Sequence, residues 1–157
     1  MILFSTWALA GKLALGWRGH TPGDATDILA NKPDASCTKD PEEGVAWRCA
    51  EPIGSATVLV HYMVDAPTHL FMGVFILCDN YTNCTALRDA LDSAWGKGDV
   101  QPGRTMPDTT WTEGTALAAW AYNTFSDTGK LSVIDMRLHA QVKAAQKEAA
   151  KKAAESL

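Results

Sequence analysis

The stretch ATVLVHYMV (residues 56–64) is followed by DAPTH (residues 65–69) and then by LFMGVFILC (residues 70–78). Both apolar runs are rich in β-branched and aromatic residues, which favour extended strands. Pro67 lies between the runs and argues against one continuous helix. The stretch therefore predicts an antiparallel hairpin at the centre of a sheet, with both faces of the hairpin largely covered.

The sequence upstream of this hairpin predicts one more strand, two helices and a loop. Residues 45–49 alternate between apolar and polar side chains, which is typical of a short strand. Residues 1–18 are mostly apolar on every side of a helical wheel and predict a buried N-terminal helix. Residues 21–31 begin with Thr-Pro-Gly-Asp, a helix-start pattern, and residues 33–44 predict a loop rich in proline and acidic residues.

The sequence downstream predicts a middle helix, a long loop, a second hairpin and a C-terminal helix. Residues 85–95 carry apolar side chains at four-residue spacing and predict a helix that Thr85 caps. Residues 96–110 are rich in glycine and proline and predict a loop. Residues 116–138 hold two runs in which apolar and polar side chains alternate, on either side of Asp-Thr-Gly, and predict a second hairpin. Residues 140–157 are strong helix formers with few large apolar side chains and predict a helix on the surface.

Together these elements predict a single α+β domain over residues 1–157. Its core, over residues 45–139, would be a mainly antiparallel sheet of about five strands, made of two hairpins and one strand. An N-terminal helix, the middle helix and a surface helix at the C-terminus would flank that sheet. This order of elements is similar to that of small acidic type III secretion chaperones, and no functional residue is carried over from that family.

Four cysteines form two pairs that are close in sequence. Cys37 and Cys49 flank the acidic loop, and Cys78 and Cys84 flank a polar segment. An even number at these spacings suggests two short-range disulfides, although four cysteines allow three connectivities. Disulfides would place the protein in an oxidising compartment, periplasmic or secreted, whereas buried reduced thiols would suit the cytosol.

The charge and hydropathy of the sequence limit the kinds of molecule that the protein is expected to bind. Fourteen Lys and Arg against eighteen Asp and Glu give a net charge of −4, and no basic run is interleaved with aromatic residues. Nucleic acid is therefore excluded as the expected partner. Residues 2–17 are too short for an ordinary membrane span. The favoured interpretation is that they dock in the core; the alternatives are docking on a membrane or on a larger complex, and the remnant of a longer export segment. The acidic side chains between His20 and Glu51 are expected on a solvated face.

Motifs for catalysis are missing from the sequence. It holds no glycine-rich phosphate loop and no nucleophile elbow, so we assign no catalytic residue and no cofactor. One constellation, His61, Asp65 and His69, flanks the turn of the central hairpin and could bring two imidazoles and a carboxylate together on a metal. Ordinary turn and strand-end roles are the favoured interpretation of these three residues.

The leading hypothesis is a non-catalytic extracytoplasmic protein-binding module. It would act as an inhibitor or immunity-type binder, or as an accessory subunit of a membrane-associated complex. The expected contact residues are Arg104 and Trp111 in and beside the long loop, because Arg and Trp often anchor interfaces, and Asn80 and Tyr81 in the polar segment. The alternatives are a small metal-assisted hydrolase using His61 and His69, and a cytosolic secretion chaperone.

Intact mass after thiol alkylation tests the compartment. We expect the native protein to remain unmodified and the reduced protein to take up four alkyl groups, one for each cysteine. Four modified cysteines without reduction would contradict the extracytoplasmic hypothesis and favour the chaperone.

Overall fold

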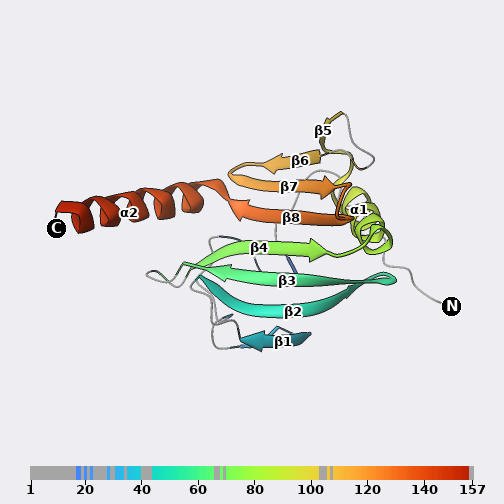
Figure 1. Cartoon of the computed structure of the whole chain (residues 1–157), viewed down its shortest axis with the longest axis horizontal. Helices are drawn as coiled ribbons and strands as arrows, with labels where there is room; N and C mark the ends of the chain where they lie inside the picture. Colours follow the sequence, from blue (N-terminus) through green and yellow to red (C-terminus); the bar gives the residue numbers. More distant parts are fainter. Residues whose placement is uncertain are drawn as a thin grey trace.

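The computed structural model describes residues 17, 18, 20, 22, 28, 31–33, 35–39, 44–65, 68, 70–102, 106 and 108–155. These residues form one antiparallel sheet of eight strands with two helices (Figure 1). The strands are β1 (Ser36–Lys39), β2 (Val45–Ile53), β3 (Ala56–Val64), β4 (Phe71–Cys78), β5 (Asp99–Gln101), β6 (Asp108–Glu113), β7 (Ala116–Asn123) and β8 (Thr128–Asp135). The helices are α1 (Tyr81–Trp95) and α2 (Met136–Glu155).

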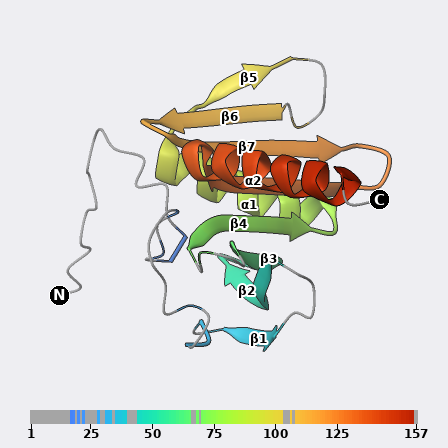
Figure 2. The same cartoon turned by 90° about the vertical axis from the view of Figure 1, so that its left-hand side faces the viewer.

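The sheet consists of two halves with the same order of elements. Its strand order is β1-β2-β3-β4-β8-β7-β6-β5, and Figure 2 shows it from β1 at the bottom to β5 at the top. In each half four strands follow one another through antiparallel pairings, and a helix comes after the fourth strand. The halves join where β4 pairs with β8, from Gly73 opposite Ile134 to Cys78 opposite Gly129. The chain thus runs ββββα twice, although no sequence repeat predicts it.

The expectation of about five strands and three helices is wrong, because the described residues hold eight strands and two helices. The two predicted hairpins are confirmed as β3–β4 and β7–β8. The extra strands are β1, β5 and β6, which lie in segments whose composition predicted loops. Strands β1 and β5 are short and polar and lie at the two margins of the sheet, where few apolar side chains are needed. Strand β6 lies one position inside and buries Thr109 and Trp111. Residues 1–16 of the N-terminal helix predicted over residues 1–18, and most of the helix predicted over residues 21–31, lie outside the described residues. Trp17 and Arg18, at the end of the first predicted helix, lie in a turn instead.

One face of the sheet carries the core. Along β3, Val58, Val60 and Tyr62 are buried, whereas the alternating residues Leu59, His61 and Met63 are half-buried. Helix α1 packs on the buried face through Leu87 and its neighbours, and it contacts β2, β3, β4 and β8. Both faces of the central hairpin were expected to be largely covered; α1 buries one face, and most side chains on the other face are half-buried.

Both helices begin earlier than predicted, because other residues cap them. Asn80 caps α1, and Thr85 instead donates its hydroxyl to the Tyr81 carbonyl within the helix. Asp135, at the end of β8, accepts hydrogen bonds from the backbone N–H groups of Arg137 and Leu138, so α2 begins at the next residue. No helix in the described part of the chain is long and apolar enough to cross a membrane.

The Asp135 cap also fixes the direction of α2. Burial opposes ionisation of this carboxyl, but the hydrogen bonds from Leu138, Thr115 and Arg137 outweigh burial and hold its pKa below the usual value. The backbone N–H of Met136 donates to the Thr115 carbonyl at 2.8 Å. Helix α2 therefore leaves the end of β8 without a linker and extends away from the sheet, with contacts mainly to β8 (Figure 1).

Substitution of Gly73 tests the junction between the halves. Its φ is +142°, and a Cβ atom there would lie 1.9 Å from the Val133 carbonyl oxygen on β8. Because backbone must move to admit a methyl group, we expect Gly73→Ala to lower the free energy of unfolding by about 3 kcal/mol or more in urea titrations. Gly54→Ala is the control, since its φ is +59° with nothing within 4 Å, and should cost about 1 kcal/mol. Equal losses would contradict the close approach.

Candidate functional site

The segment between Cys78 and Cys84 is the entry into α1. The two cysteines form a disulfide that ties the end of β4 to the first turn of the helix. The Asn80 side chain accepts a hydrogen bond of 2.8 Å from the backbone N–H of Asn83, which completes the cap. Tyr81 follows as the first helical residue, and its side chain is 52% exposed. The predicted contact residues Asn80 and Tyr81 therefore lie on a rigid, exposed turn.

The turn between β7 and β8 presents an exposed aromatic residue that sequence reasoning missed. Phe125 is 101% exposed, so its ring contacts little of the protein. Its backbone N–H donates to the Asn123 side chain at 2.9 Å, and the Tyr122 hydroxyl donates to Asp127 at 2.8 Å. Burial and the hydrogen bond to Asp127 raise the pKa of the Tyr122 hydroxyl, which therefore stays protonated as a donor. The turn is ordered by its own hydrogen bonds.

These two exposed aromatic residues lie at the same end of the molecule. Cys78 on β4 is directly opposite Gly129 on β8, and the sulfur of Cys84 lies 3.9 Å from the Asp127 carbonyl oxygen. Figures 1 and 2 show the β7–β8 turn beside the start of α1. We call the surface formed by Asn80, Tyr81 and Phe125 the aromatic end.

The structure does not place Trp111 on this surface. Its side chain is 3% exposed, and its indole N–H donates to the Gly96 carbonyl at 2.8 Å. The ring packs edge-on against Trp95, and the Arg88 guanidinium lies 5.5 Å from its centroid. The expectation of an exposed contact residue is wrong for Trp111, because β6 turns it toward α1. Arg104 lies outside the described residues.

The metal constellation is not assembled among the described residues. His61 is on β3 and packs edge-on against Phe75 of β4, at a centroid distance of 6.1 Å. Asp65 accepts a hydrogen bond of 3.1 Å from the backbone N–H of Thr68 and so shapes the hairpin turn. No group of three metal-ligating side chains occurs in the described part of the chain. His69 lies outside that part.

A buried carboxylate lies on β2. Glu51 on β2 is fully buried, which corrects its expected place on a solvated acidic face. The Tyr62 hydroxyl donates to one of its oxygens at 2.5 Å, and the Trp17 indole N–H donates to the other at 3.0 Å. The Arg18 guanidinium pairs with this second oxygen at 2.6 Å. Three donors and one positive charge thus compensate the buried carboxylate.

This carboxylate anchors the turn from Trp17 to His20. The two residues exchange backbone hydrogen bonds of 2.9 and 3.0 Å, and Arg18 between them adopts φ of 48°. A second guanidinium nitrogen of Arg18 donates to the Pro52 carbonyl at 2.8 Å. The sequence signal for this cluster was an acidic residue, Glu51, at a position of β2 whose alternation points inward. Its partner in the register is Val58, and Tyr62 lies four residues further along β3 on the same buried face.

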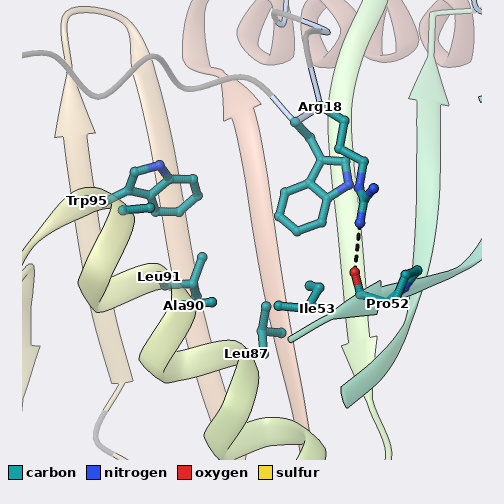
Figure 3. Close-up of a pocket in the computed structure, with 9 residues that line it drawn as sticks. Arg18, Pro52, Ile53, Leu87, Ala90, Leu91 and Trp95 are labelled. Carbon is teal, nitrogen blue, oxygen red and sulfur yellow. Dashed lines mark hydrogen bonds between the residues drawn. The ribbon is translucent and has the colours of Figure 1, made fainter. Parts of the chain in front are cut away.

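Two cavities meet at Arg18. A polar cavity of about 370 Å³ is lined by Arg18, His20, Asn31, Lys32, Pro33, Glu51 and Tyr62. An apolar groove of about 360 Å³ lies between α1 and the end of β2. Figure 3 shows Leu87, Ala90, Leu91 and Trp95 of α1 on one side of this groove, with Arg18, Pro52 and Ile53 across from them. Both volumes are in the range that suits small ligands.

The second disulfide pins the margin of the sheet. Cys37 on β1 and Cys49 on β2 are directly opposite each other and bonded, and the described residues contain no free cysteine. The predicted pairing of sequence neighbours is thereby confirmed. Two disulfides are compatible with an extracytoplasmic protein.

Comparison with protein families, curated proteins and solved structures found no match to this chain. The geometry of its own residues is therefore the basis for function.

Removal of the Tyr62 hydroxyl tests the buried cluster. Desolvation by burial and the hydrogen bond to Glu51 raise the pKa of Tyr62 well above its ordinary value of 10.0. Because the protonated phenol is the form that stabilises the fold, its contribution is complete below about pH 10 and declines as pH rises above it. We expect Tyr62→Phe to cost about 1–2 kcal/mol near neutral pH and to weaken the alkaline loss of stability.

Urea titrations at several pH values measure both effects. Tyr81→Phe is the matched control, because this tyrosine is 52% exposed and should leave both quantities unchanged. Tyr122 is present in both variants and contributes equally to their alkaline behaviour. An unchanged alkaline slope in Tyr62→Phe would contradict the role given to the hydroxyl.

Proposed function

We propose that this protein is a non-catalytic, extracytoplasmic protein-binding module, and that the aromatic end is its contact surface. The observation that carries the proposal is the complete exposure of Phe125 on a turn ordered by its own hydrogen bonds, beside Tyr81. Burying such a ring in a partner's pocket yields about 1.5–3 kcal/mol. Inhibitors, immunity-type binders and accessory subunits all use contact surfaces of this kind.

Rigidity supports this assignment. A backbone that is already held in place loses less conformational entropy on binding, so more of the energy of burying its side chains appears as affinity. The Cys78–Cys84 disulfide holds Tyr81, and the pairing of β7 with β8 holds Phe125. Polar groups around both rings, on Asn80, Asn83 and Ser126, would form the rim that such interfaces have.

A photocrosslinking experiment tests the contact surface. Phe125 is replaced by p-benzoylphenylalanine, and the protein is irradiated in cells that naturally produce it. We expect one discrete adduct, and we expect Tyr81→Ser to reduce its yield severalfold without lowering the melting temperature by more than a few degrees.

The matched control carries the same crosslinker at Val100. This residue is 47% exposed on the edge strand β5, away from the aromatic end. The same adducts from positions 100 and 125, or none from position 125, would contradict the proposed contact surface.

A further inference from the structure

We propose that the apolar groove and the polar cavity form one binding site for a single-chain amphiphile with an anionic head, such as a free fatty acid. Arg18 lines both spaces, so they lie on either side of one side chain, and in this proposal a single ligand passes along Arg18 with one end in each space. This site is separate from the aromatic end, and it does not depend on the proposed protein-binding function.

The groove has the chemistry of a site for a hydrocarbon chain. Its lining is apolar apart from Arg18, and the helix side is built from leucine, alanine and tryptophan side chains (Figure 3). The small side chains of Ala90 and Ala94 leave the room that a larger residue would fill. An extended alkyl chain placed against this lining would lose its contact with water along its length.

The polar cavity has the chemistry of a site for an anion. Lys32 and Arg18 bring two positive charges to its lining, and His20 and Asn31 add polar groups. Glu51 is the only acidic residue among the lining residues described, and this chain's own donors already occupy both of its oxygens. The cavity is therefore net positive in a chain whose total charge is −4, and it favours a carboxylate.

The boundary between the two spaces is held in position before any ligand binds. Arg18 pairs with Glu51 and donates to the Pro52 carbonyl, and its left-handed backbone is held by the bridge between Trp17 and His20. A guanidinium fixed in this way would orient the ligand, with its head beside Arg18 and Lys32 and its chain along α1. Preorganisation of this kind raises affinity because less ordering is needed on binding.

Calorimetric titration of the full chain with dodecanoate, below its micelle-forming concentration, tests the site. We expect one molecule to bind per chain, and we expect dodecanol, which has the same chain without the charge, to bind at least tenfold more weakly. Equal binding of dodecanol would overturn the assigned head site, and no heat from dodecanoate would overturn the whole proposal. Binding to vesicles of anionic phospholipid without binding of dodecanoate would also overturn it.

One pair of variants tests the apolar groove, and a second pair tests the polar cavity. Ala94→Trp fills the groove and should abolish dodecanoate binding, whereas Ser93→Trp, at an exposed neighbouring position outside the lining, should leave it unchanged. Lys32→Gln should weaken binding about fivefold, as expected for an exposed ion pair. Lys39→Gln on β1 is its control. Loss of binding in Ser93→Trp, or full binding in Ala94→Trp, would contradict the groove.

Discussion

The antiparallel pairing of β4 with β8 is the contact on which the rest of the molecule depends. It joins two four-stranded halves that otherwise share few neighbours, and it unites their buried side chains into one core. Val74 and Ile76 from one half lie beside Leu131 and Val133 from the other, all on the face that α1 covers. The approach is close at Gly73, where only a residue without a side chain fits. The aromatic end exists because this pairing places the β7–β8 turn beside α1.

The buried carboxylate of Glu51 is the second interaction that organises the structure. An isolated buried carboxylate would be costly, and removing any one of its partners would leave a charge or a polar group uncompensated. The cluster of Trp17, Arg18 and Tyr62 around Glu51 therefore links the turn from Trp17 to His20 to strands β2 and β3. Because Arg18 also lines both cavities, the same interactions that stabilise the fold determine the shape of the proposed ligand site.

Sequence patterns predicted the elements whose stability comes from local apolar content. The β3–β4 hairpin, the body of α1 and the pairing of neighbouring cysteines all follow from spacing within about twenty residues. The strands β1, β5 and β6 could not be predicted in this way, because β1 and β5 are polar and form only through neighbours in the sheet. Tertiary context overrides intrinsic preference in such segments.

The candidate sites were predicted only in part for the same reason. Tyr81 was identified from the polar segment that contains it, but Phe125 was treated as part of an alternating strand. The alternating run that begins at Ala116 was expected to continue through Phe125, but β7 ends at Asn123 and Phe125 lies in the turn that follows. Trp111 was misplaced because composition does not show which face of a strand points toward a helix. Glu51 was misplaced because its compensating donors come from distant positions in the chain.

The short strands at the two margins of the sheet affect how this protein behaves among copies of itself. A long, apolar outer strand offers its free backbone groups as a template for another molecule, which leads to aggregation. Here β5 is only three residues long with every side chain exposed, and β1 is four residues long and ends in a lysine. The disulfide between Cys37 and Cys49 also holds β1 against β2. The two outer strands of this sheet therefore offer little free backbone to another copy of the chain.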